Sequence, residues 1–262
     1  MPSNQRLVDS VVDTIPQRIS KVPQVTLLFW AIKIAATTLG ETGGDAVSMS
    51  MGLGYLAATV VFGMTFLGAV GAQIAVERFN PYLYWTTIIA TTTVGTTLAD
   101  FADRSLGIGY AGGASALLAL LIASLAVWYR TLGTVSVDSV SSPKAEMFYW
   151  VTIMLSQTLG TALGDWTADS AGLGYTGAAA VFSVLLASVV AAYFWTNISR
   201  TLLFWAAFVL TRPLGAVVGD FLDKPVAQGG LALSRYSASA ALLLLIAACI
   251  IVFPQKAASR SH

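Results

Sequence analysis

An aromatic-tryptophan pair, a glycine and an aspartate recur four times along the chain in one register. Counted from the glycine, the tryptophan lies ten residues before it and the aspartate five residues after it in every copy. The copies are Phe29, Trp30, Gly40 and Asp45; Tyr84, Trp85, Gly95 and Asp100; Tyr149, Trp150, Gly160 and Asp165; and Phe204, Trp205, Gly215 and Asp220. A fixed period of this kind predicts a fold made of repeated units that share one structure.

Long apolar runs place these repeats in a membrane. Only 10% of the 262 residues are charged, whereas soluble domains contain about 25%. A membrane-spanning helix needs about 20 apolar residues, and each repeat supplies two such segments. The predicted helices cover residues 24–45, 53–76, 81–101, 109–129, 146–166, 174–195, 201–221 and 234–253. The sequence therefore predicts an all-α, polytopic membrane protein with eight transmembrane helices.

The direction of the repeats follows from the number of helices in each. Because that number is even, the four two-helix repeats are parallel, and a pseudo-symmetry axis along the membrane normal relates them. In the predicted transmembrane topology, nine basic residues fall on one side of the membrane and three on the other. This bias predicts that both termini are cytoplasmic. The three basic residues on the outer side are Arg104, Lys224 and Arg235.

A polar segment between the second and third repeats divides the chain into two membrane halves. We expect a cytoplasmic N-terminal segment (1–22), a first half (23–130), an inter-half loop (131–145), a second half (146–253) and a cytoplasmic tail (254–262). Residues 1–22 lack the apolar core of a secretory signal peptide. Their apolar residues share one helical face, which predicts a short helix at the interface or against the bundle.

A glycine-rich turn follows the first helix of each repeat. It ends in Gly-x-Gly-Tyr at residues 52–55, 107–110 and 172–175, and the glycines allow a tight turn with positive φ. The fourth repeat lacks this motif and has a longer turn containing Gln228, Gly229 and Gly230.

One face of the first helix in each repeat is polar. Positions three residues before, one after and five after the glycine are four residues apart, so they share a helix face. They read Thr37, Glu41 and Asp45; Thr92, Thr96 and Asp100; Gln157, Thr161 and Asp165; and Arg212, Ala216 and Asp220. If the four faces converge on a common axis, the aspartates form one layer with Glu41 just beneath it.

The clustered carboxylates carry the functional hypothesis. Facing lipid, they would cost on the order of 10 kcal/mol, so we expect them to face a cavity or one another. Such a cluster is a hard-oxygen site for a cation or for protons. The candidate metal ligands are Glu41, Asp45, Asp100, Asp165 and Asp220. The candidate substrate pathway contains Trp30, Lys33, Thr37, Trp85, Thr92, Thr96, Trp150, Gln157, Thr161, Trp205 and Arg212.

Structural roles compete with this interpretation. Threonine, glycine and alanine at four-residue spacing also pack membrane helices together, and the aspartates could cap the following turn. The tryptophans are either interface anchors or an aromatic floor. Packing alone does not require carboxylates, however, so it does not explain the charge.

Two basic residues lie on the same polar faces. Lys33 and Arg212 each lie two turns before an acid, Glu41 and Asp220 respectively, so internal ion pairs are one interpretation. The other is a charge that competes with a substrate cation or takes part in a proton relay. Either role argues against a simple open cation pore. The second acids, Asp103, Asp169 and Asp223, are expected to be solvated residues of the outer mouth.

Several classes of protein are disfavoured. Cys249 is the only cysteine and His262 the only histidine, which disfavours disulfides and zinc or copper sites with Cys and His ligands. A net charge of +1 gives no reason to expect nucleic acid as a partner, and no nucleotide-binding loop is present. No cofactor is expected beyond a bound divalent cation.

The four copies of the aromatic-Trp, Gly and Asp pattern resemble the bacterial integral-membrane family defined by a tandem repeat of unknown function. The resemblance covers residues 24–253, and the fourth repeat is its weakest match because it has Arg212 and Ala216 at mid-face. The resemblance implies two membrane spans per repeat and a bacterial inner membrane, but it implies no substrate.

Three functions follow from the polar face. The leading hypothesis is a membrane transporter for a small cation, a hard divalent such as Mn²⁺ or Mg²⁺, or for a proton-coupled solute. A non-transporting scaffold or regulatory partner is the alternative, and further copies of the chain are candidate partners beside the bilayer. An intramembrane aspartyl hydrolase, suggested by Gly-Asp at 44–45, 164–165 and 219–220, needs one matched pair of aspartates. The four parallel equivalents argue against it, and we do not expect an enzyme.

Overall fold

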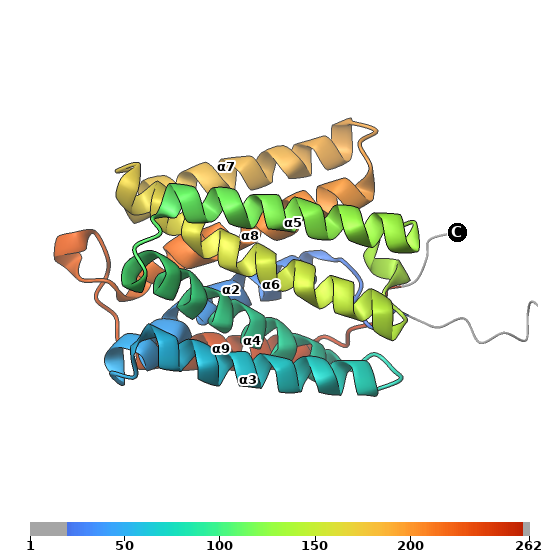
Figure 1. Ribbon diagram of the computed structural model, residues 1–262, viewed down its shortest axis with the longest axis horizontal. Coiled ribbons are helices and arrows are strands. Elements are labelled where there is room, and N and C mark those ends of the chain that lie inside the picture. Colours follow the sequence, from blue (N-terminus) through green and yellow to red (C-terminus); the bar gives the residue numbers. More distant parts are fainter. Residues whose placement is uncertain (1–19, 259–262) are drawn as a thin grey trace, which may run out of the picture.

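The computed structural model describes residues 20–258 as an all-helical bundle, without strands in that range. Its eight long helices run side by side, as Figure 1 shows. They are α2 (Leu27–Asp45), α3 (Gly54–Ala75), α4 (Pro81–Asp100), α5 (Tyr110–Leu132), α6 (Pro143–Asp165), α7 (Gly174–Trp195), α8 (Arg200–Asp223) and α9 (Arg235–Val252). The eight predicted helices are confirmed. The helix expected near the N-terminus falls largely on residues 1–19, outside the described range.

The ends of the helices lie within three residues of the predicted ends. The start of α6 is one of the differences, at Pro143 instead of residue 146. Ser142 caps this helix by accepting a hydrogen bond from the Ala145 N–H, and a proline is well tolerated in the first turn.

The first helices of the four repeats form a closed inner ring. α2 packs against α4, α4 against α6, α6 against α8, and α8 back against α2. The four polar faces therefore surround one axis. The two sequence halves do not form separate bodies, because α4–α6 and α8–α2 contacts join them as closely as the contacts within each half.

The second helix of each repeat packs outside the inner helix of the next repeat. α3 lies on α4, α5 on α6, α7 on α8, and α9 returns to α2. In Figure 1, α5 and α7 lie on one side of the inner helices, and α3 and α9 on the other. Only 6% to 11% of the residues in the apolar windows of these outer helices are buried. Their apolar side chains are thus available to lipid.

Five helices have the length and hydropathy of a membrane span: α3, α5, α7, α8 and α9. The remaining inner helices are more polar because their polar faces are turned toward the axis and away from lipid. The protein is therefore a helical membrane protein whose apolar outer helices surround a polar interior.

The repeated glycines allow the inner helices to approach closely. A Cβ atom on Gly215 would overlap the Thr37 hydroxyl oxygen, and one on Gly160 would overlap Cγ of Arg212. The glycines of the first two repeats face Thr92 and Gln157 in the same way. Each central glycine thus receives the polar side chain of the neighbouring repeat, as small residues do in membrane helix packing.

Beyond the aspartate, the first three inner helices pass directly into one turn of π-helix. These turns are Ala46–Ser50, Phe101–Ser105 and Trp166–Ser170. The glycines of the Gly-x-Gly-Tyr motifs follow with φ between 62° and 81°, which confirms the predicted turn. Asp45, Asp100 and Asp165 make no side-chain capping bond to these turns. The alternative that they serve as caps is therefore wrong.

The opposite end of the ring is closed by aromatic side chains. Trp85, Trp150 and Trp205 are buried, with at most 4% of their surface exposed, and Trp30 is half-buried. The hydroxyls of Tyr84 and Tyr149 are 2.6 Å apart across the α4–α6 contact, while Phe29 packs against Trp85 and Phe204. The geometry is that of an aromatic floor and not of a belt facing lipid.

Candidate functional site

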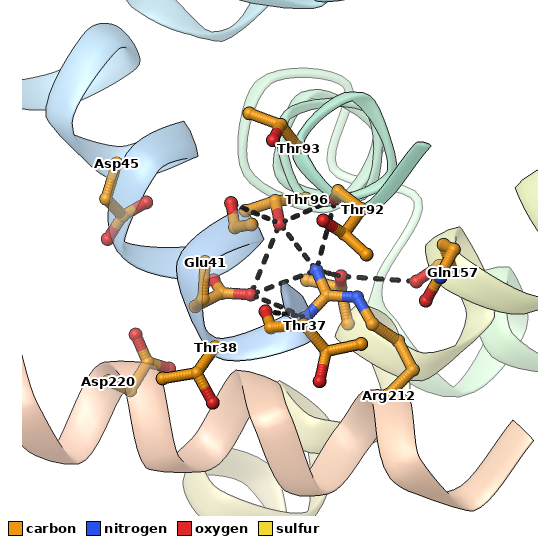
Figure 2. Close-up of polar contacts among 12 residues, drawn as sticks. Thr37, Thr38, Glu41, Asp45, Thr92, Thr93, Thr96, Gln157, Arg212 and Asp220 are labelled. Carbon is orange, nitrogen blue, oxygen red and sulfur yellow. Dashed lines mark hydrogen bonds and ion pairs between the residues drawn. The ribbon is translucent and has the colours of Figure 1, made fainter. Parts of the chain in front are cut away.

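A buried ion pair occupies the centre of the ring. Arg212 from α8 and Glu41 from α2 are 0% and 2% exposed. Both terminal nitrogens of the guanidinium donate to one carboxylate oxygen, Nη2 at 3.1 Å and Nη1 at 3.2 Å from Glu41 Oε2. Figure 2 shows the guanidinium between the helices, with Glu41 on one side and Gln157 on the other.

The same guanidinium also forms hydrogen bonds to oxygen atoms of α2, α4 and α6. It donates to the Thr37 carbonyl oxygen of α2 at 3.3 Å, the Thr92 carbonyl oxygen of α4 at 3.4 Å and the Thr161 hydroxyl of α6 at 2.6 Å. It also bonds the Thr96 hydroxyl, which itself donates to Glu41. Charge-assisted bonds of this kind are stronger than neutral ones. Arg212 therefore ties all four inner helices together at mid-axis.

The internal ion pairs expected along single helices are not formed. Arg212 pairs with Glu41 across the ring and not with Asp220, and Lys33 does not pair with Glu41. The physical reason is distance, because eight residues along a helix span about 12 Å. Lys33 Nζ instead lies 4.2 Å from the centroid of the Phe208 ring and has no hydrogen-bond partner within residues 20–258.

The four aspartates form the expected layer, and basic residues bridge them in pairs. Arg104 lies 2.7 Å from Asp100 and 3.6 Å from Asp165. Lys224 lies 2.6 Å from Asp45 and 3.1 Å from Asp220. All four aspartates are at most 3% exposed. Each bridging base thus serves two acids from neighbouring inner helices.

The acids around Lys224 favour its charged form. Burial by itself lowers the pKa of Lys224, but the carboxylates of Asp220 and Asp45 raise that pKa above its ordinary value. Burial likewise lowers the pKa of Arg104, and Asp100 and Asp165 more than reverse the effect.

Sequence reasoning used these bridging residues only to orient the chain. Their spacing does carry a signal, because Arg104 and Lys224 each follow an aspartate of the layer by four residues. That spacing places two side chains on one helix face. The first and third repeats have Met49 and Asp169 at the corresponding position, so only alternate repeats supply a base.

The outer acids differ from one another. Asp169 is exposed, which agrees with a solvated mouth, whereas Asp103 is half-buried and its Oδ1 atom is buried without a hydrogen-bond partner among the described residues. Asp223 is 7% exposed and pairs with Arg235 at 2.9 Å, so the expectation of a solvated side chain is wrong for this residue. The longer turn of the fourth repeat brings Arg235 to this position, where it also lies 3.6 Å from Asp45.

Two further residues of the candidate pathway, Gln157 and Thr37, are buried inside the ring. Gln157 is fully buried, and neither atom of its side-chain amide has a partner in the described part of the chain. Thr37 donates its hydroxyl to the carbonyl oxygens of Ile34 and Thr211, so this residue connects α2 to α8.

The four repeats match a known family model, described as a Repeat of Unknown Function (DUF347), at residues 28–79, 83–134, 148–199 and 203–253. The chain belongs to this family. No curated protein and no solved structure matches the chain. Each DUF347 repeat thus comprises one inner and one outer helix, and the expected resemblance is confirmed.

Two groups of acids in these DUF347 repeats lie close enough together to hold a metal ion. Glu41, Asp45 and Asp100 each offer one carboxylate oxygen within 4.8 Å of the others, and so do Asp45, Asp220 and Asp223. Asp165 belongs to neither group. Asp45 is common to both groups.

Proposed function

We propose that the protein is a secondary transporter that exchanges a small, hard cation for protons across a bacterial inner membrane. The observation that carries this proposal is the charge of the aspartate layer. The four aspartates of the layer and the buried Asp223 share three bases, Arg104, Lys224 and Arg235. These five acids therefore have an excess of two negative charges over the three bases when all of them are ionised.

An excess of buried negative charge is unfavourable unless something neutralises it. Each uncompensated charge at membrane depth costs about 2.5–3.5 kcal/mol on the insertion scale. Either one divalent cation or two protons would neutralise the layer, and carboxylates bind both. Competition between the two is the chemical basis of cation–proton exchange.

The closed axis favours a transporter over a channel. The Arg212–Glu41 pair fills the centre of the ring, and the aromatic floor covers the end away from the aspartates. A cation that enters at the aspartate layer meets a fixed positive charge before it can cross. Passage then requires a change of conformation, as in secondary transporters.

The orientation we propose places the aromatic floor in the cytoplasm. Lys21, Lys144 and Lys256 lie in segments at that end, in accordance with the positive-inside rule. Reporter fusions at the C-terminus would test this. Activity of a C-terminal reporter that functions only outside the cytoplasm would show that the orientation is the reverse.

Proteoliposome assays test the proposed exchange. Purified protein is reconstituted with a pH-sensitive dye inside the vesicles, and Mn²⁺ or Mg²⁺ is added outside. We expect cation entry coupled to alkalinisation of the lumen. Asp100→Asn should abolish both signals, whereas Asp169→Asn, an exposed aspartate of the same end, should leave them unchanged. Equal flux through wild type and Asp100→Asn would refute the proposal.

A scaffold remains the second candidate function because the outer helices carry small residues on their exposed faces. A Cβ atom added at Gly68 or Gly71 of α3, or at Gly112 of α5, would meet no neighbouring atom within 4 Å. Such surfaces accept another membrane helix. Recovery of a stoichiometric membrane complex, without any cation flux, would favour this function.

A further inference from the structure

The four contacts between inner helices differ at the level of the aspartates. We call each of these contacts a seam. A base bridges the carboxylates at two of them, Arg104 at the α4–α6 seam and Lys224 at the α2–α8 seam. Within residues 20–258, no base bridges the aspartates at the α2–α4 and α6–α8 seams.

The two unbridged seams are not equivalent. The position one turn below the aspartate holds Glu41 in α2, whereas the α6–α8 seam has Thr161 and Ala216 there. The α2–α4 seam therefore brings together three carboxylates, of Glu41, Asp45 and Asp100, and the α6–α8 seam only two. An asymmetric site follows from a single difference between the repeats.

We propose that the transported cation binds in the α2–α4 seam, between the carboxylates of Glu41, Asp45 and Asp100. This inference depends on the proposed transport function and gives it a location. The three oxygens lie within 4.8 Å of one another. Asp45 is 1% exposed, and its Oδ1 atom has no hydrogen-bond partner among the described residues. A buried carboxylate oxygen without a partner is unfavourable, and a cation would satisfy it.

The bonds already present leave room for this cation. Lys224 and Arg235 lie against Oδ2 of Asp45, Arg212 and Thr96 against Oε2 of Glu41, and Arg104 against Oδ1 of Asp100. The other oxygen of each carboxylate has no hydrogen bond within residues 20–258.

The second acidic group is a poorer cation site. Its members Asp45 and Asp220 already share the ammonium of Lys224, and Asp223 pairs with Arg235. Each of these two bases thus bridges two acids of the group, since Arg235 also contacts Asp45. At the α2–α4 seam, four bases contact the three acids, but each of them contacts only one acid of the group. A metal ion there would have to displace an ammonium at 2.6 Å from Asp45.

The limit of 4.8 Å on the separations of the three oxygens is compatible with hard cations of different sizes. Ca²⁺ binds oxygen at about 2.3–2.6 Å, so its ligands can be about 5 Å apart. Mg²⁺ binds at about 2.0–2.1 Å and requires its ligands within about 4.2 Å. Separations below 4.8 Å are compatible with both ranges, so the seam admits an ion of either size and the binding series below compares them.

Binding measurements on single-site variants test this location. The apparent affinity of the full-length protein in detergent is measured from thermal stabilisation by Ca²⁺, Mn²⁺ and Mg²⁺. Asp100→Asn should weaken binding by at least about tenfold, since even loss of an outer-shell partner costs 10–100-fold. Asp165→Asn removes charge from the same layer but no proposed ligand, so it should weaken binding clearly less than Asp100→Asn does. Asp169→Asn should change nothing.

A double variant extends the test to Glu41. Glu41→Gln alone leaves Arg212 buried without its partner, so Glu41→Gln is combined with Arg212→Gln. We expect this protein to fold and to bind cations at least about tenfold more weakly. Equal losses in Asp100→Asn and Asp165→Asn would overturn the asymmetric site and leave transport intact. Absence of any cation binding or flux in the wild type would instead overturn the proposed function itself.

Discussion

The Arg212–Glu41 pair makes a quantitative prediction about stability. Glu41→Gln keeps the size of the side chain but leaves the guanidinium of Arg212, which is 0% exposed, without a negative partner. Removing one partner of a buried ion pair costs about 3–5 kcal/mol. Neutral acceptors remain on Thr37, Thr92 and Thr161. We therefore expect a loss of about 3 kcal/mol, at the lower end of that range.

The double variant Glu41→Gln/Arg212→Gln removes both charges. Replacement of an entire buried pair by neutral groups is often close to neutral, so this protein should be about 2 kcal/mol or more above Glu41→Gln in unfolding free energy. Reversible unfolding in mixed detergent micelles, followed by tryptophan fluorescence, measures the cycle. A double variant no more stable than Glu41→Gln would refute the ion-pair reasoning, because the two charges would then act independently.

Three further predictions use the same unfolding assay. Gly215→Ala should destabilise the protein by about 1–3 kcal/mol through overpacking against Thr37. Gly68→Ala, in open space on α3, should be neutral or stabilising by up to about 1 kcal/mol. Equal effects of the two substitutions would contradict the close approach of α8 to α2 at Gly215. Lys33→Met should raise stability or leave it unchanged, since it removes a buried amine without an acceptor among the described residues; a loss above about 1 kcal/mol would reveal a hidden partner. Arg104→Gln should destabilise the protein more at high pH than at low pH, because protonation relieves the repulsion between the carboxylates that it bridges. A loss independent of pH would show that Arg104 acts through packing.

The sequence was sufficient for the secondary structure and for the meeting of the polar faces. A regular period fixes equivalent positions in every repeat, and helix geometry then states which side chains share a face. The aspartate layer follows directly, because Asp45, Asp100, Asp165 and Asp220 occupy one position in four parallel helices.

The pairing of charges across the axis was beyond sequence reasoning. The spacing along one helix says nothing about which neighbour a long side chain reaches, so it did not reveal that Arg212 reaches Glu41. The bridges made by Arg104 and Lys224 were missed for a related reason. Both residues were assigned to the exterior by their place after the helix, but the π-helical turn and the turn of the fourth repeat return them to the layer.

The offset between inner and outer helices has a consequence for biogenesis. Because each outer helix packs on the inner helix of the next repeat, α3, α5 and α7 each await a helix that is synthesised directly afterwards. The first inner helix is different, since its outer partner α9 is synthesised after the other seven helices. α2, with its buried Lys33 and Glu41, must therefore remain in the membrane without its outer partner while α3 to α8 are translated. We expect chains truncated before Arg235 to be degraded by membrane quality control, even if their first three repeats assemble.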